Sequence, residues 1–186
     1  IYSVSWSPDG TKVVTGSSDK AAKIFDVSNG DLITKLEGHN HHIYSVSWSP
    51  DGTKVVTGSD DKTAKIWDAS TGQLLTTLTG HTGFIYSVSW SPDGTKVVTG
   101  SMDNTGQSLG SLASIAKIFD VSNGDLITTL TGHASAIRSV SWSPNSTKVV
   151  TGSDDKTAKI WDASTGQLIT TLTGHAGFIY SVSWSP

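Results

Sequence analysis

Residues 43–84 read IYSVSWSPDGTKVVTGSDDKTAKIWDASTGQLLTTLTGHTGF, and the whole chain is built on this 42-residue pattern. Its opening octet, IYSVSWSP, returns at 1–8, 85–92 and 179–186, and the variant IRSVSWSP stands at 137–144. A fixed period of this length indicates stacked structural units. We therefore divide the chain into four units and the beginning of a fifth: 1–42, 43–84, 85–136, 137–178 and 179–186.

Each unit is expected to form four short strands separated by turns. Within Ile43–Trp48, polar and apolar residues alternate, which places Tyr44, Val46 and Trp48 on one face. The tryptophans at this position are expected in the core: Trp6, Trp48, Trp90, Trp142 and Trp184. A Ser-Pro-Asp-Gly turn follows, and the remaining strands are expected at Lys54–Thr57, Ala64–Trp67 and Leu74–Leu78. Four antiparallel strands in about 40 residues are typical of one blade of a β-propeller.

The third unit is longer than the others. Alignment with its neighbours places ten extra residues, GQSLGSLASI, at Gly106–Ile115. Such a segment is a recognition loop, a tolerated flexible insertion or a retained intron, and the sequence leaves these alternatives open.

Composition excludes several classes of protein. The chain has 186 residues, a net charge of −3, no Cys and a single Arg, Arg138. Without cysteine there is no disulfide scaffold, thiolate zinc site or cysteine nucleophile. Scattered cations do not make the basic patch that nucleic acids require, so we expect no nucleic-acid partner. No apolar run approaches the roughly 20 residues that span a bilayer, so we expect no membrane partner.

The repeated residues resemble the WD-repeat β-propeller family. The marks of this family are Gly-His and Trp-Asp pairs: Gly38-His39, Gly80-His81, Gly132-His133, Gly174-His175, Trp67-Asp68 and Trp161-Asp162. The resemblance covers the chain except the insert, and it implies an all-β fold of four-stranded antiparallel blades. Because propellers have about four to eight blades, and this family usually about seven, we expect a partial ring here.

The resemblance also implies a hydrogen-bonded tetrad in each complete blade. Its members are a His before the first strand, a Thr on the second, an Asp in the next turn and a Trp on the third. In blades 2 and 4 these are His39, Thr57, Asp61 and Trp67, and His133, Thr151, Asp155 and Trp161. Blade 3 has His81, Thr99 and Asp103 but Phe119 in place of Trp, and blade 1 has Thr15, Asp19 and Phe25 without a His. Blades 1 and 3 are therefore expected to be the less stable pair.

The histidines invite two other interpretations. A His-Asp-Thr set resembles a catalytic triad, but it recurs in successive blades, whereas an active site needs one asymmetric constellation. His39, His41 and His42 could hold a metal, but the tetrad already uses His39. We therefore expect no catalytic residues, no cofactor and no metal.

Positions at which the repeats differ are the candidates for partner binding. One set lies in the loop after Gly-His and at the start of the first strand, and another immediately precedes the turn Asp: Ser18, Asp60, Met102 and Asp154. The candidate partner-binding residues are His41, His42, Tyr44, Phe84, Tyr86, Met102, Arg138, Phe178 and Tyr180. Aromatic, Arg and Met side chains are common interface anchors, although neutral drift in loops explains such variation equally well.

The sequence thus predicts a non-enzymatic scaffold that binds a protein or peptide through one face of the propeller. The alternative is a structural unit of a large assembly, or a designed repeat protein, without a specific ligand. The remaining blades are expected in missing sequence, with another chain as the alternative source. With no signal peptide visible, we expect an intracellular, cytoplasmic location.

Overall fold

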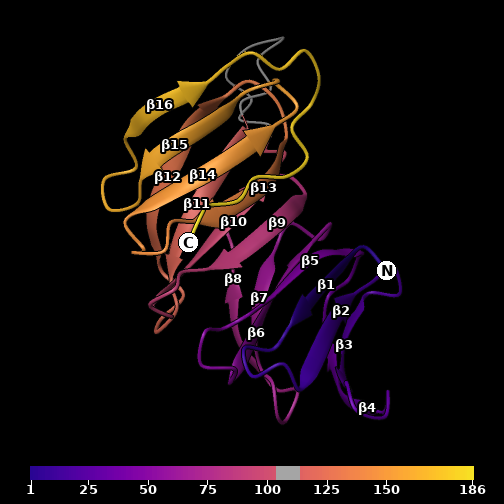
Figure 1. The fold of residues 1–186 in the computed structure, drawn as a ribbon. Coiled ribbons are helices and arrows are strands. Elements are labelled where there is room, and N and C mark those ends of the chain that lie inside the picture. Colours follow the sequence, from indigo (N-terminus) through magenta and orange to yellow (C-terminus); the bar gives the residue numbers. More distant parts are fainter. Residues whose placement is uncertain (104–113) are drawn as a thin grey trace.

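The computed structural model describes residues 1–103 and 114–186, which form four antiparallel sheets of four strands each (Figure 1). The first two sheets contain β1 Ser3–Trp6, β2 Lys12–Gly16, β3 Ala21–Asp26 and β4 Leu32–Glu37, then β5 Ile43–Trp48, β6 Lys54–Ser59, β7 Ala64–Asp68 and β8 Leu74–Leu78. The other two contain β9 Ile85–Trp90, β10 Lys96–Ser101, β11 Ser114–Asp120 and β12 Leu126–His133, then β13 Ile137–Trp142, β14 Lys148–Ser153, β15 Ala158–Asp162 and β16 Leu168–Leu172. The all-β fold of propeller blades in a partial ring is confirmed.

Within each sheet the strands pair in the order of the sequence, so each blade is a simple meander. The first strands β1, β5, β9 and β13 pack against one another from blade to blade, and the fourth strands lie at the opposite sheet edges. Figure 1 shows the blades following one another from indigo to yellow.

The hydrophobic core lies between consecutive sheets rather than within any one of them. At the first junction, Val14, Ile24 and Leu36 of blade 1 pack against Val46 and Trp48 of blade 2. The same positions form the second and third junctions. Because each blade covers the face of the preceding one, an apolar strand residue is buried only where a neighbouring blade exists.

The octet repeated in the sequence also carries hydrogen bonds between blades. Trp48 donates its indole N–H to the Ser5 carbonyl at 3.2 Å, and Val46 donates its backbone N–H to the Ser3 hydroxyl at 3.2 Å. Both bonds recur at the next two junctions. The two serines of SVSW therefore join adjacent first strands, a role that strand alternation alone does not indicate.

The terminal blades show what this arrangement leaves uncovered. Trp6 is 61% exposed whereas Trp48 is 6% exposed, and Leu172 is 47% exposed whereas Leu78 is buried. The expected core position of Trp6 is therefore wrong, because none of the four described blades covers that face. Trp184 is half-buried.

Residues 179–186 were expected to form the first strand of a further blade, but the structure assigns no strand there. A strand needs a paired neighbour, and none of the described strands pairs with this segment. The segment still packs as a first strand does, because Val182 donates to the Ser139 hydroxyl and Trp184 to the Ser141 carbonyl.

Strict alternation also fails at the start of the first strands. A β-bulge between Ile43 and Ser45 leaves Tyr44 without a partner on β6. Ile43 is consequently buried with Val46 and Trp48, while Tyr44 leaves the core face. Bulges of this kind redirect a side chain, and here they do so at one position in successive blades.

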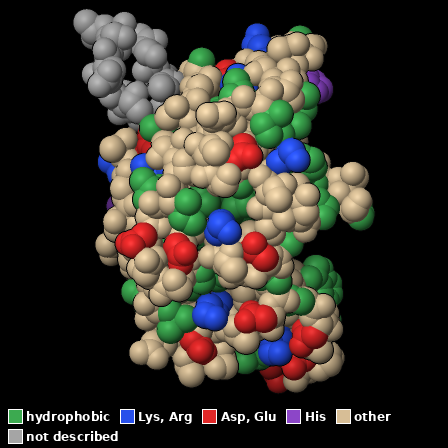
Figure 2. All heavy atoms as spheres, turned by 90° about the vertical axis from the view of Figure 1, so that its left-hand side faces the viewer, with side chains coloured by type: hydrophobic (Ala, Val, Ile, Leu, Met, Phe, Trp, Pro, Cys, Tyr) green, Lys and Arg blue, Asp and Glu red, His purple; other side chains and the backbone are tan. Residues whose placement is uncertain are grey.

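The expected insert at Gly106–Ile115 lies outside the described residues except at its end. Ser114 and Ile115 belong to β11, which pairs with a lengthened β12 so that Ser114 lies opposite His133. The described part of the chain contains no helix long and apolar enough to cross a membrane. On the face shown in Figure 2, acidic and basic side chains lie interspersed among uncharged ones.

Candidate functional site

The structure brings together the tetrad residues of blade 2. His39 Nδ1 lies 2.7 Å from Asp61 Oδ2, and its Nε2 lies 2.7 Å from Thr57 Oγ1. Trp67 donates its indole N–H to the same hydroxyl oxygen at 2.9 Å. The sequence places these groups on two strands, a turn and the loop before β5, and the sheet register brings them into one network.

Blade 4 repeats the network and fixes its direction. Burial lowers the pKa of His133, and the hydrogen bond to Asp155 offsets this only in part, so the imidazole is neutral at pH 7. Its Nδ1–H then donates to Asp155 at 2.6 Å, and Nε2 accepts from the Thr151 hydroxyl at 2.7 Å. Thr151 accepts in turn from Trp161 at 2.9 Å. Each buried polar group of the tetrad thus has a hydrogen-bond partner, because an unpaired polar group is unfavourable in the apolar interior.

Blade 3 lacks one link of this chain. His81 contacts Asp103 and Thr99 at 2.6 Å each, but the buried Phe119 offers no N–H to the Thr99 hydroxyl. Burial raises the pKa of Asp103, but the hydrogen bond and charge of His81, with the amides of Thr82 and Gly83, outweigh it and lower that pKa to about 2.

Blade 1 has no comparable network in the described residues. Asp19 is exposed and pairs with Lys23 at 2.8 Å, while Thr15 and Phe25 are half-buried. The side chains of His39, His81 and His133, in contrast, have no exposed surface. These imidazoles are closed off from solvent and make their hydrogen bonds within their own blades.

A different set of residues forms an accessible row across the blades. The bulges direct Tyr44, Tyr86 and Arg138 away from the junction cores. Tyr2 extends this row on blade 1, and we call Tyr2, Tyr44, Tyr86 and Arg138 the aromatic row. Neighbouring ring centroids lie 5.1 Å apart for Tyr2 and Tyr44, and 5.3 Å apart for Tyr44 and Tyr86.

Arg138 ends the aromatic row with a cation. Its guanidinium carbon lies 4.3 Å from the centroid of the Tyr86 ring, a cation–π geometry. Three contacts of 2.6–3.0 Å join the same guanidinium to Asp154. The hydrogen bond with Asp154 raises the pKa of Arg138.

Two loop side chains flank the aromatic row. His42 lies 6.0 Å from Tyr2 and 6.3 Å from Tyr44, centroid to centroid, and Phe84 lies 6.4 Å from Tyr86. Burial raises the pKa of Tyr44, and the nearby charge of Asp60 adds to the shift. The sequence comparison missed Tyr2 as a candidate, although the identity of its octet with that of Tyr44 was the available signal.

The other candidates lie around this site or apart from it. Met102 is 37% exposed, and its amide donates to the Phe84 carbonyl. His41 is exposed, and its carbonyl accepts a hydrogen bond from Ser59. Phe178 and Tyr180 form a separate exposed pair with centroids 6.3 Å apart.

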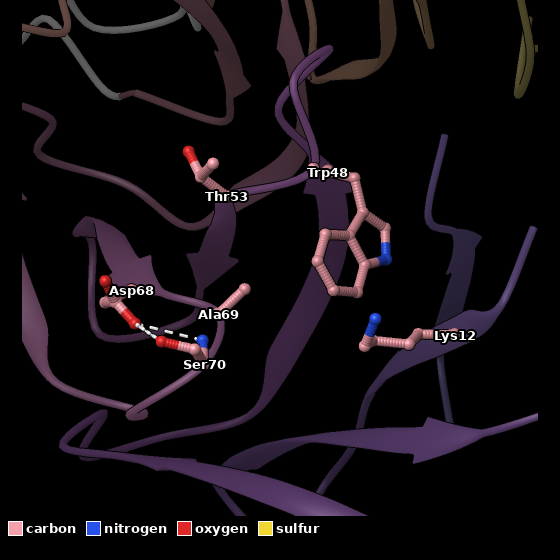
Figure 3. A pocket seen from close by; sticks show the side chains of 7 residues that line it. Lys12, Trp48, Thr53, Asp68, Ala69 and Ser70 are labelled. Atoms are coloured by element: carbon pink, nitrogen blue, oxygen red, sulfur yellow. Dashed lines mark hydrogen bonds between the residues drawn. The ribbon is translucent and has the colours of Figure 1, made fainter. Parts of the chain in front are cut away.

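A groove lies between blades 1 and 2, apart from the aromatic row. Figure 3 shows Lys12 and Trp48 on one side and the Asp68–Ser70 turn on the other, where Ser70 donates to the Asp68 carboxylate at 2.7 Å. Corresponding residues of blades 2 and 3 line a second groove. Because the groove repeats with the scaffold, its residues are explained by the fold. Within residues 1–103 and 114–186, no three His, Cys, Asp or Glu side chains gather to hold a metal.

The family model described as "WD domain, G-beta repeat" matches residues 1–26, 30–68, 72–106, 124–162 and 166–186. The chain belongs to this family. The matches at 30–68 and 124–162 start before the fourth strand of one sheet and end with the third strand of the next, so a sequence repeat spans two blades. Repeats of this family generally form non-enzymatic scaffolds for protein interaction.

Curated relatives match over one repeat. The chain is 60% identical over 30 residues to the "Poly(A)+ RNA export protein" of Schizosaccharomyces pombe, which is 16% of this chain and 8% of that protein. It is 45% identical over 40 residues to "WD repeat-containing protein VIP3" of Arabidopsis thaliana, and 44% over 39 residues to the "Denticleless protein homolog" of Xenopus tropicalis. These alignments cover 22% and 21% of the chain, and 12% and 6% of the relatives, so the chain spans only a small part of their length.

Proposed function

We propose that the chain binds a protein or peptide through the face that carries the aromatic row. The observation that supports this proposal is that Tyr2, Tyr44, Tyr86 and Arg138 form one contiguous series of contacts at bulged or variable positions. Bulges disturb strand pairing, and the junction cores do not use these side chains. Amphipathic rings on a rigid sheet edge are suitable interface anchors because little conformational freedom remains to be lost on binding.

A selection from a random peptide library tests this proposal. Phage-displayed peptides are selected on the wild-type chain, and the enriched peptides are titrated against the Tyr44→Ala/Tyr86→Ala variant. Leu75→Ala is the matched control, because Leu75 is an exposed apolar residue on β8, at the opposite sheet edge. Far-UV circular dichroism verifies that each variant is folded.

We expect affinity to fall about tenfold or more in the double variant and to remain unchanged in the control, as for interface hot spots. Enriched peptides that bind all three proteins equally would place recognition elsewhere. A selection that enriches no peptide would favour the purely structural role.

A further inference from the structure

The fourth blade shows how this fold holds a cation. The Arg138 guanidinium lies over the Tyr86 ring of the preceding blade at 4.3 Å, and it is hydrogen-bonded to Asp154. The Asp154 side chain is only 10% exposed, so its carboxylate is largely shielded from water, whereas Arg138 is 29% exposed. A carboxylate and an aromatic face together thus hold one guanidinium.

The second blade has the same carboxylate without the cation. Asp60 occupies the position of Asp154, and its amide donates to the carbonyl of His42 at 2.9 Å just as that of Asp154 donates to Ala136. Tyr44 stands where blade 4 has Arg138.

The carboxylate of Asp60 is incompletely satisfied. Its Oδ1 is buried and has no hydrogen-bond partner among the described residues. A buried acceptor without a donor is unfavourable, so a donor that reaches it is stabilising. Asp60 as a whole is half-buried, so a ligand approaches its exposed part, whereas Oδ1 itself is covered by the chain.

A cluster of aromatic rings lies beside Asp60, whose charge acts on Tyr44 and whose amide donates to the His42 carbonyl. Tyr2, His42 and Tyr44 have pairwise centroid separations of 5.1–6.3 Å, and Tyr2 is 54% exposed. Tyr2 belongs to the blade preceding Asp60, as Tyr86 belongs to the blade preceding Asp154. Blade 2 therefore offers the partners that Arg138 has in blade 4, but to a cation from outside the chain.

We propose that Asp60, Tyr2, His42 and Tyr44 bind an arginine side chain of the partner. This rests on the proposed peptide-binding function and names the side chain recognised. Arginine is favoured over lysine because its planar guanidinium stacks on a ring while donating to a carboxylate in the same plane. The site needs no movement of the tetrads, which lie in the buried part of the blades.

Capped heptapeptides of the form Gly-Gly-Ser-X-Ser-Gly-Gly test the proposal, where X is arginine, lysine or citrulline. Each is titrated into the isotope-labelled chain, and the dissociation constant is taken from NMR shifts of amide and aromatic signals. Citrulline keeps the shape of arginine without its charge. We expect the citrulline peptide to bind at least about tenfold more weakly than the arginine peptide, and the lysine peptide to be intermediate.

Three variants locate the binding. Asp60→Asn removes the charge and should weaken the arginine peptide at least about tenfold. Tyr44→Arg supplies an internal cation, as in blade 4, and should also abolish binding without removing the carboxylate. Asp125→Asn removes an acid from the β11–β12 turn, where its side chain contacts only Asn123, and should bind as wild type.

Three results would each overturn the arginine site. The first is equal affinity for the arginine and citrulline peptides, and the second is unaltered binding by Asp60→Asn or Tyr44→Arg. The third is no binding of the arginine peptide. Library peptides that depend on Tyr44 and Tyr86 but not on arginine would leave the proposed function standing while refuting this inference.

Discussion

Replacing Phe119 with tryptophan tests the tetrad by completing an incomplete one. In blades 2 and 4 an indole N–H donates to the tetrad threonine at 2.9 Å. In blade 3 the Thr99 hydroxyl contacts His81 but receives no such donor. Phe119→Trp is therefore expected to add a buried hydrogen bond and to stabilise the chain.

The structure indicates room for the larger ring. A Cβ placed on Gly38 would lie 3.3 Å from the Trp67 ring, whereas the nearest atom to a Cβ on Gly80 is Lys117 Nζ at 3.9 Å. A neutral hydrogen bond contributes about 0.5–1.5 kcal/mol, and burial of the added ring atoms brings the expected gain to about 1–2 kcal/mol. For a chain of this size the melting temperature should rise by about 2–8 °C.

Thermal melts followed by far-UV circular dichroism measure this gain without interference from the new fluorophore. The Thr99→Val background provides the control, because the introduced indole then has no hydroxyl to bond. Trp161→Phe removes the corresponding donor from blade 4 and should lower the melting temperature. An unchanged or lower melting temperature for Phe119→Trp, or a gain of the same size in the Thr99→Val background, would refute the reasoning.

Three further predictions concern packing, the tetrads and pH. Gly100→Ala should lower the free energy of unfolding in urea by about 1–3 kcal/mol, because its Cβ would lie 2.7 Å from a core methyl group of the next blade. Gly152→Ala should lower it less, because its contacts lie in segment 179–186, which belongs to no sheet. Thr57→Val should lower the free energy of unfolding by about 2–4 kcal/mol in the same assay, because it leaves the buried His39 Nε2 and Trp67 Nε1 unpaired. A loss below about 0.5 kcal/mol would contradict this. Folding lowers the pKa values of His133 and Asp103, so the free energy of unfolding should be highest above about pH 6.5. It should first decline below that pH, because the folded chain resists protonation of His133. It should fall further between about pH 4 and 2, as Asp103 is protonated. Melting temperatures measured from pH 8 to 2 test this order, and a rise on acidification would contradict it.

Much of the fold could be predicted because the repeats state the same pattern several times. The expected strand at Ile43–Trp48 agrees with β5, and that at Leu74–Leu78 agrees with β8. The placement of Tyr44 could not be predicted from alternation, since a bulge depends on how two strands pair and not on one strand alone. The exposure of Trp6 likewise depends on a neighbouring blade.

The candidate site was predictable only in part. Differences among repeats pointed to Tyr44, Tyr86 and Arg138, which the structure brings into one row. The same comparison marked Asp60 and Asp154 as variable but could not distinguish their environments. Only three-dimensional contacts reveal that Asp154 pairs with Arg138, whereas Asp60 pairs with no cation among residues 1–103 and 114–186.

The hydrogen bonds between first strands join residues 43 positions apart at the first two junctions, and they connect only nearest neighbours. The blades therefore behave as a one-dimensional lattice, in which each folded blade provides the template for the next. Unfolding in such a lattice begins at a boundary and moves inward, so the blades at the two ends should open most often. Native-state hydrogen exchange should then be slowest in β6 and β10 and faster in β2 and β14, a gradient set by position along the array, since the four strands have nearly the same sequence.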